Sequence, residues 1–339
     1  MPSGWKRLRY WLEWLGLVLA TKLVPILSRR ICFHLAQFSG AIISVLDRHG
    51  RKVALSNLEA ALPELSRRER GRIARESFQH FARTMLDLLW SPRLTRENVL
   101  RYVEFENFEE IARVTGPERS FIMACYHYSN FEWLSIAGGY GGIIGTIISQ
   151  EFKNELLAPV FKEIRERPGH EFVPRQRGIL RLYKALRRKR TTALLVDLTI
   201  SPRQGAVAID CFGLKTSVTA AHIWLHQRTG IPIIPAHCQP LPKGRYRIVF
   251  HPQIETTPAM TVPQIAQACW DSFEPYLRDH PAPWLWMYKH WRYRPVDADR
   301  SYPFYANIYE RFDDLLAEQR APADAGPGST RPDEPLAHC

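Results

Sequence analysis

The chain of 339 residues lacks paired cysteines. Its six cysteines lie far apart with no repeated spacing, at Cys32, Cys125, Cys211, Cys238, Cys269 and Cys339. This distribution argues against a zinc site and a disulfide framework, and it is typical of a protein in a reducing compartment. We therefore expect no metal, and nothing else in the sequence calls for a cofactor.

A clean membrane-spanning run is also missing. Near the N-terminus, basic residues flank an apolar stretch that carries Trp5 and Trp11 at its leading edge, but Glu13 and Lys22 interrupt it. It falls short of the roughly 20 apolar residues that a span needs, and no small-residue cleavage site of a signal peptide follows it. Tryptophan and basic side chains suit the headgroup region of an anionic membrane. We expect residues 1–28 to form an interfacial anchor helix, with an ordinary amphipathic core helix as the alternative.

Acidic residues are in the minority. The chain has 46 Lys and Arg against 34 Asp and Glu, a formal net charge of +12. Such a charge predicts a polyanionic partner: nucleic acid, anionic lipid or an acidic carrier protein. No zinc, RNA-binding or helix-turn-helix pattern supports nucleic acid. The basic residues occur in short clusters along the whole chain, which favours an anionic membrane surface and an acidic carrier.

The hydrophobic pattern changes at about residue 116. Before it, residues 29–115 read as a helical region packed on the core, including a helix opened by the capping box Ser66 to Glu69. After it, residues 116–318 alternate short apolar runs with helical stretches. The predicted strands are 121–125, 143–148, 192–196, 207–212, 231–238 and 245–251, and the predicted helices are 131–137, 154–167, 178–188, 217–228 and 263–277.

This alternation predicts an α/β fold with a mixed, mostly parallel central sheet flanked by helices. The last two strands are expected to form an antiparallel pair. Residues 319–339, rich in Ala, Pro, Gly and Asp, are expected to be a disordered tail.

The segment His127-Tyr-Ser-Asn-Phe-Glu132 is the strongest candidate site. It follows an apolar run, so a strand would present the imidazole at its carboxyl end, where sites in open α/β sheets gather. A carboxylate near the ring would orient it and leave the other nitrogen free to take a proton from a hydroxyl. The alternative is structural: Ser129 to Glu132 also fits a capping box, with Ser129 as the N-cap. No Gly-x-Ser-x-Gly motif surrounds Ser129, so we do not expect it to be a nucleophile.

Further segments along the chain resemble those of the bacterial lipid A late acyltransferases, within a superfamily that carries an H-x4-D/E motif. The resemblance runs from about Trp11 to Tyr305. Its pieces, in the family's order, are 51–64 with Asn-Leu and Pro-Glu, His127 to Glu132, Lys153-Asn154 and Arg165, Arg175-Gln-Arg177-Gly178, the strand end at Asp197, Phe212-Gly213, Thr219, and 283–295 with its Trp, His, Arg and Lys residues.

The resemblance implies transfer of a fatty acyl group from a thioester of acyl carrier protein, or of coenzyme A, to a hydroxyl of a lipid A precursor. It implies the cytoplasmic face of a bacterial inner membrane as the location. His127 is then the general base, Glu132 orients it, and Arg175 binds the oxyanion or, equally well, a phosphate of the acceptor. Substrate-binding candidates are Arg177, Asp197, Asn130, Lys153 and Asn154.

Two departures from the family pattern concern the acceptor. Tyr126 stands where glycine is usual, and only one acid, Asp197, remains of the usual Pro-Asp-Gln-Asp stretch. A lysophospholipid or glycolipid acyltransferase of the same superfamily is therefore an alternative. An alternative of a different class is a non-catalytic membrane-surface scaffold.

Overall fold

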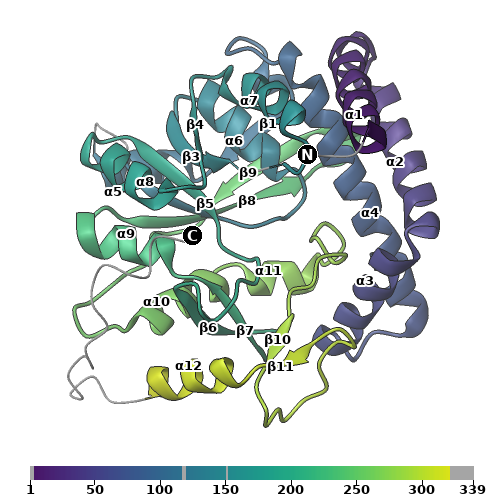
Figure 1. The fold of residues 1–339 in the computed structure, drawn as a ribbon. Helices are drawn as coiled ribbons and strands as arrows, with labels where there is room; N and C mark the ends of the chain where they lie inside the picture. Colours follow the sequence, from purple (N-terminus) through teal and green to yellow (C-terminus); the bar gives the residue numbers. More distant parts are fainter. Residues whose placement is uncertain (1–3, 117–119, 150–151, 321–339) are drawn as a thin grey trace.

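The computed structural model describes residues 4–116, 120–149 and 152–320. Seven strands form one central sheet in the order β1-β9-β8-β2-β5-β3-β4 (Figure 1). Their bounds are β1 Val103–Glu106, β2 Ile122–Cys125, β3 Gly145–Ser149, β4 Glu171–Pro174, β5 Thr191–Leu195, β8 Ile233–Pro240 and β9 Tyr246–Phe250. Strands β4, β3, β5, β2 and β8 run parallel, so their carboxyl ends lie along one edge of the sheet.

The expected α/β fold with a mostly parallel central sheet is confirmed. The predicted antiparallel pair is also present, since β8 and β9 pair antiparallel from Ala236 and Phe250 onward. One predicted strand lies elsewhere: β6 (Ala206–Cys211) pairs only with β7 (Leu214–Thr219), in a separate hairpin.

Helices cover both faces of the sheet because the strand residues alternate in direction. On β2, Ile122 and Ala124 join one buried cluster, while Met123 and Cys125 join the other. The first face packs against α8 (Gly178–Arg187), α9 (Ala221–Thr229), α10 (Val262–Asp271) and α11 (Glu274–Asp279), and the second against α5 (Phe108–Thr115), α6 (Phe131–Tyr140) and α7 (Ala158–Glu166).

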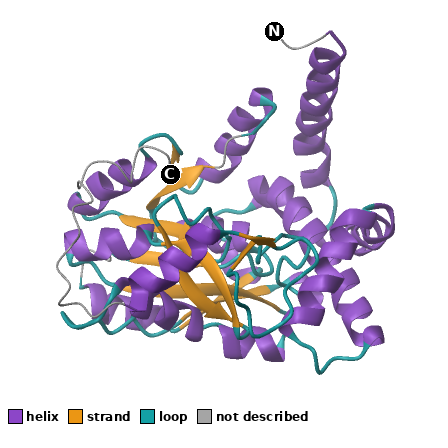
Figure 2. Cartoon of the chain, turned by 60° about the horizontal axis from the view of Figure 1, so that its bottom comes forward, coloured by secondary structure: helices purple, strands orange, loops and turns teal. Residues whose placement is uncertain are grey.

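The N-terminal part is helical, as expected. It contains α1 (Gly4–Leu23), α2 (Arg29–Leu46), α3 (Arg48–Ala61) and α4 (Arg67–Trp90). The predicted capping box opens α4: the Ser66 hydroxyl accepts from Glu69 N–H, and the Glu69 carboxylate accepts from Ser66 N–H. Figure 2 shows α1 projecting from the body of the molecule, with the N-terminus at its tip.

An unusual distribution of side chains characterises α2. Its buried residues are small, and Gly40 lies so close to α4 that an added Cβ would sit 2.4 Å from Gln79 Cα. The opposite side of the helix exposes large apolar residues, with Phe38 67% and Leu46 73% exposed. Helix α1 likewise exposes Trp5. None of the described helices combines the length and the apolar character needed to cross a membrane.

Besides the two-residue strands β10 (Tyr293–Arg294) and β11 (Asn307–Ile308), three longer strands were not predicted. Strands β1 and β4 have four residues each and carry charged residues, so their apolar pattern is weak. Strand β7 includes residues 217–219, which the sequence pattern places at the start of a helix; that helix, α9, begins at Ala221, after the residues that pair with β6.

Two residues of the predicted C-terminal tail lie in a helix. Residues Gln319 and Arg320 end α12 (Glu310–Arg320), where Gln319 Oε1 accepts from Ala208 N–H at 2.8 Å. The rest of the predicted tail, residues 321–339, lies outside the described part of the chain.

Candidate active site

His127 lies at the carboxyl edge of the sheet, two residues after β2. Its Nδ1 is 2.8 Å from Asp197 Oδ1, and its backbone N–H donates to Asp197 Oδ2 at 2.9 Å. Asp197 follows β5, which pairs parallel to β2, so the two strands deliver the acid and the imidazole to the same edge. The ring is partly exposed, with 12% of its side chain accessible, while the Asp197 side chain is fully buried.

A third donor completes the shell around Asp197. Trp284 Nε1–H donates to Asp197 Oδ2 at 2.9 Å. Burial alone would raise the pKa of the carboxyl, but the positive charge that His127 can carry and the hydrogen bonds from His127 and Trp284 lower that pKa below its ordinary value. Asp197 is therefore a carboxylate at neutral pH. An acceptor-only partner makes Nδ1 the protonated ring nitrogen, which leaves Nε2 as the proton acceptor.

The C-terminal segment that carries Trp284 is tied to the loop after His127. Tyr128 forms a single β-bridge with Trp284, and Ser129 N–H donates to Pro283 O at 2.9 Å. Trp284 stacks on His290 with ring centroids 3.8 Å apart. Burial lowers the pKa of His290 to about 4, so this ring is neutral.

Glu132 forms no hydrogen bond with the His127 imidazole among the described residues. It is buried on α6, where Arg165 Nε and Nη2 donate to its two oxygens at 2.9 and 2.6 Å. The expected contact with His127 is replaced by this bidentate pair because Arg165, on α7, packs against the start of α6. The acid that contacts His127 is Asp197, which had been considered as a substrate-binding residue.

The N-cap of α6 is Asn130 and not Ser129. Asn130 Oδ1 accepts from Trp133 N–H at 3.0 Å, and its Nδ2 donates to Asp87 Oδ2 at 3.0 Å. Ser129 adopts a positive φ of 50° and its buried hydroxyl has no partner among the described residues. Asn130 is fully buried, and its amide caps α6 and ties the start of that helix to Asp87 on α4.

The remaining predicted residues surround this edge. Arg175 directly follows β4, and Arg177 precedes α8 in a left-handed conformation; both are exposed. Lys153 is exposed as well. Asn154 is buried instead, with Nδ2 donating to Tyr10 O at 2.9 Å and to Glu13 Oε2 at 3.0 Å, so it fastens α1 to the core.

The residue that departs from the family pattern, Tyr126, faces the core. Its ring stacks on Phe273 with centroids 4.0 Å apart, and its hydroxyl donates to Cys269 O. Tyr126 is fully buried, so it has no surface to offer to an acceptor.

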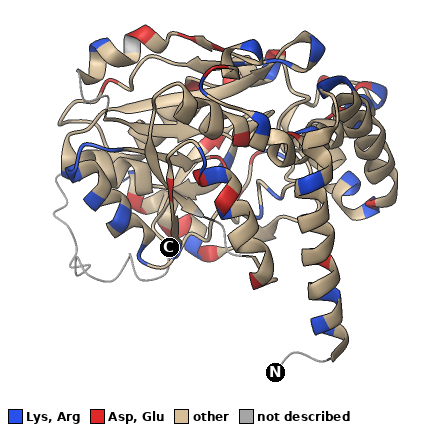
Figure 3. Cartoon of the chain, turned by 90° about the horizontal axis from the view of Figure 1, so that it is seen from above, with Lys and Arg blue, Asp and Glu red and all other residues tan. Residues whose placement is uncertain are grey.

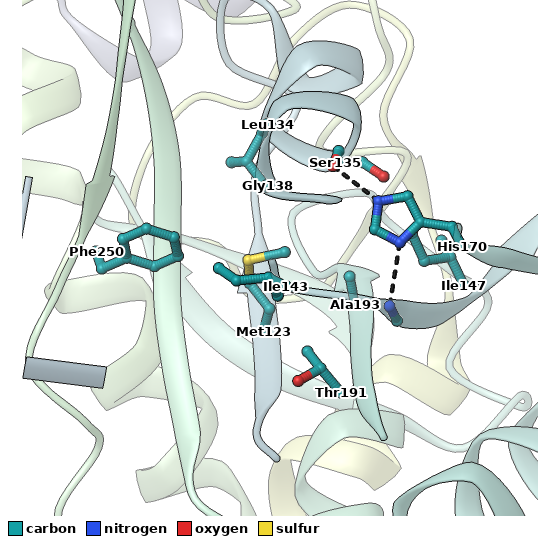
Figure 4. A pocket seen from close by; sticks show the side chains of 11 residues that line it. Met123, Leu134, Ser135, Gly138, Ile143, Ile147, His170, Thr191, Ala193 and Phe250 are labelled. Atoms are coloured by element: carbon teal, nitrogen blue, oxygen red, sulfur yellow. Dashed lines mark hydrogen bonds between the residues drawn. The ribbon is translucent and has the colours of Figure 1, made fainter. Parts of the chain in front are cut away.

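A small cavity lies between α6 and the sheet (Figure 4). His170 lines it, with Nδ1 accepting from Gly145 N–H at 3.1 Å and Nε2 lying 2.8 Å from Ser135 O. Both ring nitrogens are therefore used by the backbone. The cavity has room for about one water molecule, and its other lining residues are mostly apolar.

Two contacts of the site could not be read from the sequence. Trp284 is 87 positions from Asp197, and Arg165 is 33 positions from Glu132. No local spacing encodes such pairs, although both residues fall in segments that carry the family resemblance. No cluster of three or more His, Cys, Asp or Glu side chains that could hold a metal occurs among the residues described.

An imidazole held by a buried carboxylate can in general act as a base toward a hydroxyl. A sequence model of the family described as bacterial lipid A biosynthesis acyltransferase matches residues 4–293. The chain belongs to this family and is an O-acyltransferase.

Named relatives are similar over most of their length. The lipid A biosynthesis lauroyltransferase of Escherichia coli K12 is 22% identical over 301 residues, which cover 87% of this chain and 95% of the relative. The palmitoleoyltransferase of the same organism and the lipid A biosynthesis acyltransferase of Shigella flexneri are each 21% identical, with the same coverage.

Proposed function

We propose that this protein transfers a fatty acyl chain from a thioester to a hydroxyl of a lipid A precursor, at the cytoplasmic face of the bacterial inner membrane. The observation that carries the proposal is the His127–Asp197 pair, in a chain that belongs to the lipid A acyltransferase family. The names of the relatives, a lauroyltransferase and a palmitoleoyltransferase of lipid A biosynthesis, support this class of substrate.

In the proposed reaction, His127 Nε2 removes the proton of the acceptor hydroxyl as its oxygen attacks the thioester carbonyl. The new C–O bond forms a tetrahedral oxyanion, and collapse breaks the C–S bond. The thiolate then receives the proton from the imidazolium. General-base help of this kind is worth roughly 10²- to 10⁴-fold.

Asp197 is the acid that orients His127 in this proposal. Its fixed negative charge stabilises the imidazolium that forms during attack, and its hydrogen bond holds Nδ1 as the donor. Glu132 contributes indirectly, by holding the Arg165 guanidinium against the first turn of α6.

The exposed cations at the carboxyl edge are the candidates for binding negative charge. Arg175 is our first choice for the oxyanion, with Arg177 and Lys153 binding the phosphates of the acceptor, because a guanidinium matches phosphate oxygens. All three have accessible side chains.

The donor is proposed to be acyl carrier protein, because an acidic carrier complements a chain of net charge +12. Membrane association is proposed to use the exposed apolar sides of α1 and α2, since contiguous exposed apolar surface of this kind is uncommon on soluble monomers. Basic residues near the free end of α1 suit anionic headgroups (Figure 3).

The test is mass spectrometry of lipids from cells that carry the gene, lack it, or carry it with His127→Ala. We expect one acyl chain to disappear from lipid A in the second and third strains. Loss of an acyl chain from the phospholipid or glycolipid fraction instead would favour the alternative acceptors. Full acylation in the His127→Ala strain would point to the scaffold.

A further inference from the structure

One side of α8 carries a row of cations without counter-charges. Residues 172–196 contain eight Lys and Arg and no Asp or Glu. Helix α8 buries Ile179, Leu182 and Leu186, and it exposes Arg181, Lys184, Arg187 and, at its end, Arg188. The spacing of three to four residues places these side chains along one face. Within the described residues, none of the four forms an ion pair.

This row starts at the carboxyl edge of the sheet, the edge at which His127 lies. Helix α8 begins four residues after β4 ends, and the chain then enters β5, at whose carboxyl end Asp197 lies. The first turn of α8 is therefore near the edge that carries His127. A ten-residue helix is about 15 Å long, so the cations extend from the site down the outside of the molecule.

The row lies away from the apolar surface of the N-terminal helices. Figure 1 places α8 on the left and α1 and α2 on the right, and this separation persists in Figures 2 and 3, which are turned about the horizontal axis. A membrane that covers α1 and α2 would leave α8 accessible from the water phase. A soluble anionic partner could therefore reach these cations.

We infer that the exposed face of α8 docks the acidic carrier protein that delivers the acyl thioester. The inference rests on the proposed function, and it adds the surface at which the carrier is recognised. Leu180, 45% exposed between the cations, offers an apolar contact within the same face.

The expected signature is kinetic. Exposed ion pairs contribute little individually, but a cationic face raises the association rate of an anionic protein and makes it sensitive to salt. We therefore expect the cations of α8 to raise kcat/KM for a donor bound to the carrier protein. We expect no such increase for a small donor that has the same thioester.

The experiment uses the full chain with Arg181→Glu, Lys184→Glu and Arg188→Glu combined. A matched control, Arg67→Glu, Arg68→Glu and Arg75→Glu, reverses the same number of exposed charges on α4. With acyl carrier protein thioester, we expect kcat/KM to fall on the order of tenfold or more in the α8 variant, chiefly through KM, with a weaker salt dependence. With acyl-pantetheine, we expect less than about a twofold change for both variants.

Equal losses with both donors, equal losses in both variants, or an unchanged rate with the carrier would each overturn the docking surface. Direct binding of acyl carrier protein to the full-length protein, measured without turnover, separates this test from the proposed function. An inactive wild-type protein that still binds the carrier through α8 would contradict only the proposed reaction. A variant that binds the carrier normally but binds anionic vesicles weakly would assign the face to the membrane instead.

Discussion

At the scale of single residues, the site depends on which carboxylate holds the imidazole. Asp197 contacts both the ring and the backbone of His127, whereas Glu132 is bound by Arg165. The sequence spacing pointed to Glu132 because it is close in the chain. Asp197 is distant in the chain but lies beside the His127 ring, because it follows β5 and β5 pairs with β2.

Replacing each acid by its amide distinguishes the two roles. We expect Asp197→Asn to lower kcat by roughly two orders of magnitude or more, because an amide neither holds the tautomer nor stabilises the imidazolium. Glu132→Gln should cost less, since it weakens a pair that does not touch the ring. Steady-state kinetics on both purified variants measure this. The larger loss in Glu132→Gln would return the orienting role to Glu132.

Trp284 is expected to act through Asp197. Trp284→Phe keeps most of the buried ring but removes the Nε1–H donor, and we expect kcat to fall roughly tenfold with KM little changed, as for loss of one hydrogen bond to a charged group. The control is Trp286→Phe, in the same aromatic cluster, whose Nε1–H donates to Pro281 O and not to Asp197. Similar effects from both substitutions would mean that Trp284 matters only for packing.

At the scale of elements, prediction from sequence succeeded where the signal is local. The capping box of α4 and the strand before His127 were predicted because their patterns lie within a few residues. The short strands β1 and β4 were missed because they pair with strands that lie further away in the sequence. The start of α9 was placed too early because the residues before it pair with β6.

The exposed apolar surface continues from α1 onto α2, beyond residue 28, where the predicted membrane anchor ends. We expect deletion of residues 1–28 to weaken membrane binding only in part, because α2 keeps an exposed apolar side. Adding Phe38→Ser and Leu46→Ser to the deletion should release the protein. Sedimentation with anionic vesicles measures binding, and Val296→Ser, at an exposed apolar position elsewhere, is the control. Complete release by the deletion alone would assign the binding to α1.

At the scale of the whole molecule, buried histidines predict acid sensitivity. Burial lowers the pKa of five histidines to about 3 or 4, namely His80, His222, His237, His251 and His290. Below a pH of about 6.5, the unfolded chain binds protons that the native rings do not. The free energy of unfolding should therefore fall as pH drops from about 6.5 towards 4, by up to roughly 1.4 kcal/mol per pH unit for each ring.

Urea titrations between pH 7.5 and 4.5 measure this slope. His222 has no hydrogen-bond partner on either ring nitrogen among the described residues. We expect His222→Leu to flatten the pH dependence, because it removes one proton that only the unfolded state binds. The substitution His34→Leu on the exposed surface of α2 is the control. An unchanged slope in His222→Leu would contradict the linkage.

The segment that carries Pro283 and Trp284 also has a consequence for the order in which the site is completed during synthesis. Synthesis proceeds from the N-terminus, so α1 and α2 leave the ribosome before the rest of the chain and can reach the bilayer first. The imidazole emerges next, but Asp197 acquires its third donor only when residue 284 has been made. We expect a chain that ends before Pro283 to bind the membrane but to transfer acyl groups more slowly than the whole protein, because it lacks this donor and the bridge to Tyr128.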